Sequence, residues 1–339
     1  PSRDEEVNLE GVLRSLVSQE GWSEIIVVND HSEDRSTEIL ERLQGEIPDL
    51  IVLNAPELPA GWVGKNHALY WGAARARGEV LLFTDADTRH APGSLARSLE
   101  EMESNSVDLY SLSPAQSTLT FWERVIVPFL YVQLSKRFRF ADVQDPKSDQ
   151  AAANGQYLMI CRSAYESLGG HRAIRGEILE DVTLARRAKQ AGFRLHFASG
   201  QNSVSTRMYH SFQEIREGLK KNLCLLWGGT PSAVAIGCLR VFIVNLGPTM
   251  AFLTLWVFFL IDSGNTLVLA SLPGFFLLVC LSQWRYKALL CEQDFSSSLA
   301  AYQQLGALFF LLFLGSSAWA HFRGNEIHWK GRSYPGSRF

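Results

Sequence analysis

The sequence predicts an α/β domain followed by membrane-spanning helices. From about residue 7 to residue 205, short apolar runs alternate with segments that carry apolar residues at helical spacing. Such alternation is typical of a mostly parallel, Rossmann-like sheet with helices on both faces. Beyond residue 232 the composition changes to long uncharged stretches. Two of the apolar runs lead directly into carboxylates, which places candidate functional groups at the carboxyl ends of strands.

The elements of the α/β part follow in order. We expect helices over residues 7–19, 36–43, 66–77, 91–102 and 181–190, and strands over residues 25–28, 51–53 and 80–83. Pro92 near the start of the fourth helix suits a helix N-terminus. A parallel sheet that contains the first of these strands would normally have a strand before it, and residues 1–6 resemble the loop after such a strand. We therefore expect a first strand to be missing from this sequence.

Composition narrows the classes of partner. With 339 residues the chain is long enough for one large domain or two small ones. Its formal net charge of -3, with no run of like charges, offers no field that would attract nucleic acid. The 5 cysteines are an odd set without metal-binding spacing, so we expect free thiols in a reducing compartment.

Three stretches near the C-terminus carry no charged residue: 241–261, 266–281 and 305–320. Only the first reaches the roughly 20 residues that a spanning helix needs; the other two require flanking residues such as Trp284 and His321. Buried helices of a soluble domain are the alternative. Because the three stretches lie together at one end of the chain, we favour membrane spans.

Residues 211–227 predict a helix with one apolar face and basic residues elsewhere, which is typical of a helix in the headgroup plane. An ordinary amphipathic core helix is the alternative. Arg285 and Lys287, which we expect in the loop after the second uncharged stretch, favour a cytosolic α/β domain under the positive-inside rule. Three spans would place the basic tail on the non-cytosolic side of the membrane, which conflicts with the same rule. Either one segment is re-entrant or interfacial, or the tail is an exception.

The acidic residues suggest chemistry. Residues 25–28 lead into Asp30, and residues 80–83 into Asp85 and Asp87, so both clusters should face one crevice. Residues i and i+2 of an extended segment point the same way, which lets the second pair share a divalent cation, although such a pair also occurs in solvated turns. Glu180 and Asp181 begin a predicted helix, where they are either a simple N-terminal cap or, facing the crevice, a general base.

Five ordered motifs resemble family 2 glycosyltransferases with the GT-A fold: residues 1–5, 29–34, 64–65, 85–87 and 180–181. Three other segments resemble, more narrowly, bacterial membrane enzymes that glycosylate carotenoid or hopanoid-type lipids, with ceramide glucosyltransferases as more distant relatives. These segments are residues 58–68, 154–157 and 329–334.

The resemblance implies a UDP-sugar donor and a Mn²⁺ or Mg²⁺ cofactor. The residues it implies for the donor are Pro1, Ser2, Arg3, Glu5, Asp30, Lys65 and Asp85. Asp87 would be the main protein ligand of the metal, with Asp85 at the ribose or a metal-bound water. Asp181 would be the base, oriented by Glu180.

Three further predictions concern residues outside these motifs. The chain lacks the Gln-X-X-Arg-Trp string of processive synthases, which makes a long polymer product less expected. Arg207 is a candidate second contact of the diphosphate, because a guanidinium matches phosphate geometry, or else a solvated surface arginine. On resemblance, Gln156, Lys221 and Asn222 are acceptor-side candidates.

Together these observations predict a metal-dependent, inverting glycosyltransferase that moves a hexose from a UDP-sugar to a lipid hydroxyl. It would be a multi-pass protein of the cell (inner) membrane with a cytosolic catalytic domain. The predicted parts are a GT-A domain over 1–205, an interfacial region over 206–232, about three spans over 233–322 and a basic tail over 323–339. The alternatives are a polyprenyl-phosphate glycosyltransferase or short-chain synthase, and an inactive sugar-nucleotide-binding scaffold.

Overall fold

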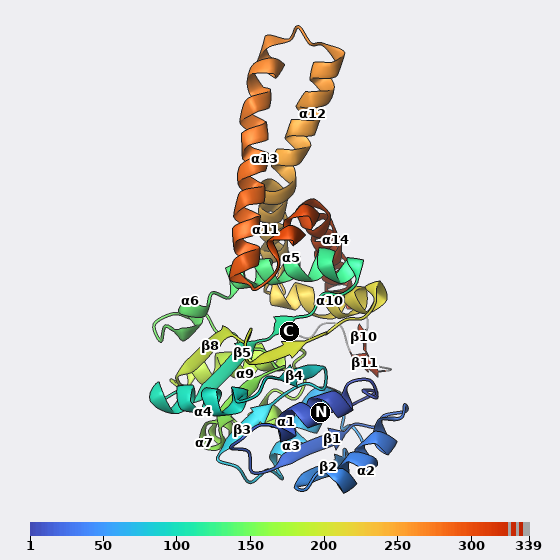
Figure 1. Ribbon diagram of the computed structural model, residues 1–339, viewed down its shortest axis with the longest axis vertical. Coiled ribbons are helices and arrows are strands. Elements are labelled where there is room, and N and C mark those ends of the chain that lie inside the picture. The colour runs from blue at the N-terminus through green and yellow to red at the C-terminus, as the bar shows by residue number, and fades with distance from the viewer. Residues whose placement is uncertain (325–326, 330–331, 335–339) are drawn as a thin grey trace. The chain divides into compact units, whose positions relative to one another are not determined.

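The computed structural model describes residues 1–324, 327–329 and 332–334. It divides the chain into two compact units: Pro1–Ser117 with Arg137–Met208, and Thr118–Lys136 with Tyr209–Phe339. The first unit is the α/β part and the second is helical (Figure 1). This division differs from the predicted limit of 1–205 in two respects: residues 118–136 group with the helical unit, and the α/β unit extends to Met208.

The α/β unit contains three small sheets (Figure 1). Its strands are β1 (Ile25–Asn29), β2 (Leu50–Asn54), β3 (Val80–Phe83), β4 (Thr88–His90), β5 (Leu109–Ser113), β6 (Ala115–Gln116), β7 (Leu158–Cys161), β8 (Leu195–Ser199) and β9 (Val204–Thr206). The sheet orders are β1-β2, β3-β7-β5-β8 and β4-β9-β6. β1-β2, β5-β8 and β6-β9 pair in parallel, whereas β7 runs antiparallel to both of its neighbours. The α/β class is confirmed, with a more mixed pairing than the mostly parallel sheet that we expected.

Helices cover these strands and close the core. They are α1 (Leu9–Val17), α2 (Ser36–Glu46), α3 (Gly64–Ala73), α4 (Ser94–Ser104), α6 (Phe140–Gln144), α7 (Arg162–Ser167), α8 (Gly170–Ala173) and α9 (Glu180–Gln190). Leu9, Val12 and Leu13 of α1 are buried, as the apolar spacing predicts. Leu184 of α9 packs in one core cluster with Ile160 of β7. Burial of these side chains fixes which face of each helix is turned toward the sheet.

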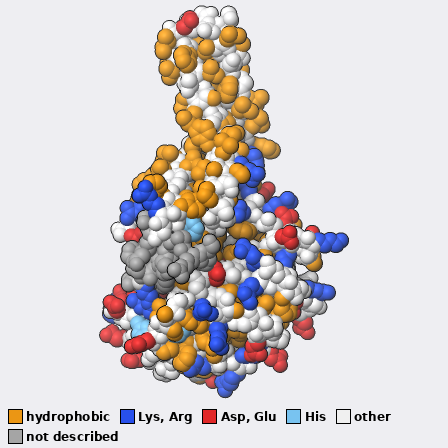
Figure 2. All heavy atoms as spheres, turned by 180° about the vertical axis from the view of Figure 1, so that it is seen from behind, with side chains coloured by type: hydrophobic (Ala, Val, Ile, Leu, Met, Phe, Trp, Pro, Cys, Tyr) orange, Lys and Arg blue, Asp and Glu red, His pale blue; other side chains and the backbone are white. Residues whose placement is uncertain are grey.

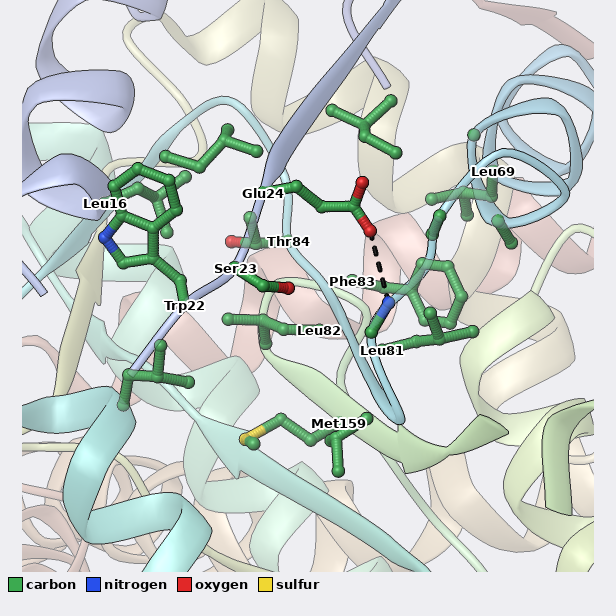
Figure 3. A pocket seen from close by; sticks show the side chains of 18 of the residues that line it. Leu16, Trp22, Ser23, Glu24, Leu69, Leu81, Leu82, Phe83, Thr84 and Met159 are labelled. Carbon is green, nitrogen blue, oxygen red and sulfur yellow. Dashed lines mark hydrogen bonds between the residues drawn. The ribbon is translucent and has the colours of Figure 1, made fainter. Parts of the chain in front are cut away.

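A pocket of 340 Å³ lies between β1 and β3 (Figure 3). Its lining is mainly aliphatic and aromatic, and Leu16, Trp22 and Met159 are among the side chains that point into it. The Glu24 carboxylate accepts a hydrogen bond from the Gly78 amide, 3.2 Å away, at its border. None of the predicted carboxylate ligands lines this pocket, although Pro1 of the predicted donor loop and Thr84, next to Asp85, do.

The second unit is built from helices. They are α5 (Phe121–Arg137), α10 (Phe212–Leu226), α11 (Pro231–Val241), the π-helical η1 (Phe242–Leu246), α12 (Gly247–Ile261), α13 (Thr266–Glu292), the 3-10 helix η2 (Ser297–Tyr302) and α14 (Gln303–Phe322), followed by the strands β10 (Ile327–Trp329) and β11 (Arg332–Tyr334). Aromatic side chains hold α5 in this unit: Phe129 contacts Phe310 of α14, and Trp122 contacts Phe212 of α10. These partners explain why residues 118–136 leave the α/β part.

In the part of the chain that the structure describes, three helices are long and apolar enough to cross a membrane: Pro231–Ile261, Thr266–Glu292 and Ser297–Phe322. Only 11% and 6% of the most apolar stretch is buried in the first two, against 50% in the third. α12 and α13 form an antiparallel hairpin (Figure 1), and hydrophobic side chains cover much of its surface (Figure 2). α13 continues through Arg285 and Lys287, so the loop predicted there is wrong. A helix does not have to end where its apolar stretch ends.

The apolar face of α10 is buried, as the core-helix alternative expects. Ile215, Leu219 and Leu223 are at most 3% exposed. Ser317 of α14 links the two helices, because its hydroxyl donates to the Lys220 carbonyl and accepts from the Cys224 amide. α10 is therefore part of the packed core of this unit.

Replacing Gly306 of α14 by alanine is expected to destabilise the helical unit by about 2 kcal/mol, because overpacking a tight contact forces backbone shifts. An added Cβ would lie 2.7 Å from the Val125 carbonyl oxygen and 2.9 Å from the Phe129 Cβ of α5. The matched control is Gly315→Ala on the same helix, where nothing lies within 4 Å. Thermal unfolding in detergent measures the difference, and equal melting temperatures for the two variants would contradict this packing.

Candidate active site

Lys65 connects two of the predicted acidic motifs. Its ammonium, at the start of α3, lies 2.8 Å from an Asp85 carboxylate oxygen after β3 and 2.7 Å from a Glu180 oxygen at the start of α9. Burial by itself would lower the pKa of Lys65, but the surrounding carboxylates, Asp85 and Glu180 first among them, raise it well above its usual value. The ammonium therefore stays charged and holds the two acidic elements together.

Asp181 is held by main-chain donors. One of its carboxylate oxygens accepts from the Gly155 amide and the other from the Val182 amide, each at 2.8 Å. The bond to Gly155 crosses 26 residues of sequence, so Asp181 is more than a local cap of α9. Burial and the Glu180 carboxylate raise the pKa of Asp181 to about 6, although the Lys65 ammonium lowers it. A carboxylate with a pKa near the working pH suits a general base.

Gly155 is a site residue that the sequence did not single out. A Cβ at this position would lie 3.0 Å from both the Glu180 carboxylate and the Lys65 ammonium, and 3.5 Å from the Asp181 carboxylate. The absence of a side chain therefore lets three charged groups converge beside this residue. The signal in the sequence was its position next to Gln156, in a segment noted only for resemblance.

Asp87 has one bonded and one bare carboxylate oxygen. Its Oδ2 accepts from the Gln156 side-chain amide at 3.3 Å, and this amide also donates to the Thr206 hydroxyl at 3.1 Å. Its Oδ1 is buried without a hydrogen-bond partner among the described residues. Burial, followed by the carboxylates of Asp85 and Glu5, raises the pKa of Asp87 to about 6.

These features fit a divalent cation. A bare buried oxygen lacks compensation, and a cation would both satisfy Asp87 Oδ1 and relieve repulsion from Asp85. Among the residues that the structure describes, no group of three or more His, Cys, Asp or Glu forms a complete cage. The cluster instead suits an ion that takes one or two carboxylates and completes its shell with water and substrate phosphates.

The N-terminal loop is joined to the end of β1. Ser2 forms a parallel bridge with Asn29, and its main chain bonds to the Val28 carbonyl at 2.8 Å and to the Asp30 amide at 2.7 Å. The Arg3 guanidinium donates to the Asp30 carbonyl at 3.0 Å. Asp30 is only 4% exposed. The Glu5 carboxylate of this loop acts on Asp87 together with that of Asp85, so the two acidic strand ends share one neighbourhood.

Residues 1–169, the part that carries the Lys65 and Asp87 clusters, match the family model described as Glycosyl transferase family 2. The chain is a family 2 glycosyltransferase. The match covers every site residue described above except Glu180, Asp181 and Thr206.

Curated relatives extend the likeness over nearly the whole glycosyltransferase. Two proteins named 4,4'-diaponeurosporenoate glycosyltransferase, from Staphylococcus aureus strains MRSA252 and bovine RF122 / ET3-1, are each 26% identical over 98% of this chain and 86% of their own length. The solved mannosyltransferase PcManGT from Pyrobaculum calidifontis, in complex with GDP-Man and Mn²⁺, is 17% identical, with a TM-score of 0.52 over 95% of this chain and 85% of its own. This likeness shows the shared GT-A fold.

The four remaining predicted residues of the glycosyltransferase also lie outside the cluster around Lys65. Arg207 directly follows Thr206 of β9, next to the bonds that hold Asp87. The side chain of Gln156, predicted on the acceptor side, contacts Asp87. Lys221 and Asn222 lie on α10 in the helical unit, and their acceptor role stays a prediction.

Proposed function

We propose that this glycosyltransferase moves a hexose from a UDP-sugar to a membrane-dissolved acceptor in a metal-dependent, inverting reaction. The observation that carries the proposal is the convergence of Asp85, Lys65, Glu180 and Asp181 on one point. Asp87 and its bare oxygen stand beside the same Asp85. A scaffold that only binds a nucleotide would have no need of Asp181.

Asp87, assisted by Asp85, would hold Mn²⁺ or Mg²⁺ together with the donor diphosphate. Such an ion acts as a Lewis acid that neutralises charge on the leaving nucleoside diphosphate. The mannosyltransferase of the same fold, solved with GDP-Man and Mn²⁺, supports this assignment. The loop of Pro1, Ser2, Arg3 and Glu5, with Asp30, would bind the nucleoside, and Arg207 would reach the phosphates.

Asp181 would take the proton from the acceptor hydroxyl. Its two main-chain hydrogen bonds fix the orientation of the carboxylate, and Glu180 is held in turn by Lys65. One displacement on the face opposite the leaving group inverts the anomeric centre and requires no covalent intermediate. Each side chain that this step needs lies in the α/β unit.

The acceptor is proposed to be a lipid. The chain carries three helices of membrane-spanning length, and the curated relatives are named for a carotenoid substrate, 4,4'-diaponeurosporenoate. Because that name denotes a carboxylate, a second candidate is an acceptor that is already ionised, such as a carboxylate or a polyprenyl phosphate. Such an acceptor needs no base, which makes Asp181 the residue that separates the two reactions.

The decisive experiment is transfer of label from UDP-glucose into the organic phase of a bacterial lipid extract, using membranes that contain the full chain. Label that appears with Mn²⁺ and disappears with EDTA would support the proposal. Label that is insensitive to EDTA would contradict metal dependence. Binding of UDP without transfer from any of several UDP-sugars would favour the scaffold.

We also propose that only the α12–α13 hairpin crosses the bilayer. α14 is half buried by protein, whereas the hairpin exposes its apolar side chains. Two crossings keep the basic tail on the cytosolic side, as the positive-inside rule requires. Green fluorescent protein fused to the C-terminus is expected to fluoresce, because it matures in the cytosol. Activity of alkaline phosphatase fused at the same place would contradict this topology.

A further inference from the structure

One short turn contacts both functional carboxylates. The Gly155 amide donates to Asp181 at 2.8 Å, and the side chain of the next residue, Gln156, donates to Asp87 at 3.3 Å. These partners lie 26 and 69 residues away in sequence. Two adjacent residues therefore hold the proposed base and the proposed metal ligand, so a shift of this turn would move both.

The turn is itself fixed from several sides. The Asn154 side chain accepts from the Gln156 amide at 3.0 Å, and the Asn154 main-chain amide donates to the Ser111 hydroxyl of β5 at 2.8 Å. The Thr84 hydroxyl, one residue before Asp85, donates to the Gln156 carbonyl at 2.9 Å. These bonds tie the turn to β5 and to the residue directly after β3, which gives Gln156 a defined position.

Gln156 is well suited to orient a carboxylate and poorly suited to meet a lipid. It is only 3% exposed, and its amide nitrogen is shared between Asp87 and the Thr206 hydroxyl. A hydrogen bond to Asp87 Oδ2 selects one rotamer of this side chain and leaves Oδ1 as the bare oxygen. Groups that bond to a metal ligand in this way orient it and tune its affinity.

We propose that Gln156 is a positioning residue for the metal site, acting through Asp87. This inference rests on the proposed function, because it assumes that Asp87 binds a divalent cation. It replaces the acceptor-side role that resemblance suggested for Gln156. Thr206 assists in this role, because its hydroxyl accepts from the Gln156 amide and also bonds to the Asp87 carboxylate.

The test is Mn²⁺ affinity of the full-length protein in detergent with saturating UDP, measured from the electron paramagnetic resonance signal of free Mn²⁺. Gln156→Met keeps the length of the side chain and removes the donor, and its Kd for Mn²⁺ is expected to rise by about tenfold or more. Thr206→Val is expected to give a smaller rise in the same direction and serves if the first variant does not fold. Gln144→Met, at an exposed glutamine that bonds the Phe197 carbonyl, is the matched control.

The acceptor KM separates positioning of the metal ligand from contact with the acceptor. We expect it to stay unchanged in Gln156→Met at saturating Mn²⁺. An unchanged Kd for Mn²⁺ with a raised acceptor KM would overturn the inference and return Gln156 to the acceptor side. Absence of Mn²⁺ binding by the unmutated protein would overturn the proposed metal site itself, so the two failures are distinguishable.

Discussion

Replacing Asp87 by asparagine is expected to lower metal-dependent transfer of sugar by roughly 10³-fold, because the metal supplies several kcal/mol of charge stabilisation and each 1.36 kcal/mol is tenfold in rate. The substitution keeps the shape of the side chain and removes its charge. With that charge gone, the bare buried oxygen is no longer an anionic ligand. Initial rates of label transfer from UDP-glucose to lipid, measured across a series of Mn²⁺ concentrations, give the magnitude.

The pattern of the loss is as informative as its size. If Asp87 acts through the cation, part of the activity should return at high Mn²⁺, and the melting temperature should be unchanged or raised, because a buried anion with few donors has been removed. The exposed Asp149 provides the control: Asp149→Asn should leave transfer intact. Full activity of Asp87→Asn at limiting Mn²⁺ would exclude this residue as the main ligand.

Local sequence patterns correctly predicted where the site-bearing elements β3 and α9 lie. β3 occupies the residues that we expected, and α9 begins within one residue of its predicted start. These elements carry Asp85, Asp87 and Asp181, so the acidic candidates could be identified from spacing and resemblance. Lys65 contacts Asp85 after β3 and Glu180 at the start of α9, and no local spacing in the sequence predicts these two contacts.

The groups that orient these carboxylates escaped sequence analysis for a physical reason. The bond from Gly155 to Asp181 and the bond from Gln156 to Asp87 join residues far apart in the chain, and neither leaves a local periodicity. Gly155 matters through an absent Cβ, which only the folded contacts reveal. The unit to which residues 118–136 belong could not be predicted either, because the sequence of an apolar helix does not indicate which core the helix packs against.

Replacing Asp181 by asparagine distinguishes the two acceptor chemistries. If the acceptor is a hydroxyl, loss of the base is expected to lower kcat by 10²–10⁴-fold, the usual contribution of a general base. If the acceptor is a carboxylate or phosphate already ionised near neutral pH, the loss should be mild. Single-turnover rates with saturating UDP-sugar and metal, on one acceptor of each kind, give the comparison.

The pH dependence of kcat/KM provides a second, independent test of Asp181 as the base. Since burial and Glu180 raise the pKa of Asp181 to about 6, the carboxylate is protonated and inactive as a base below that pH, and ionised above it. For a hydroxyl acceptor, kcat/KM should therefore rise through about pH 6, and this step should vanish in Asp181→Asn while UDP binding is retained. Lys65 lowers this pKa, so Lys65→Met should move the step to higher pH if donor binding survives. If the pH profile is the same in Asp181→Asn and in the unmutated enzyme, Asp181 does not take the proton. If the substitution also lowers the rate only slightly, the acceptor is one that is already ionised. The substrate for which the curated relatives are named would be such an acceptor.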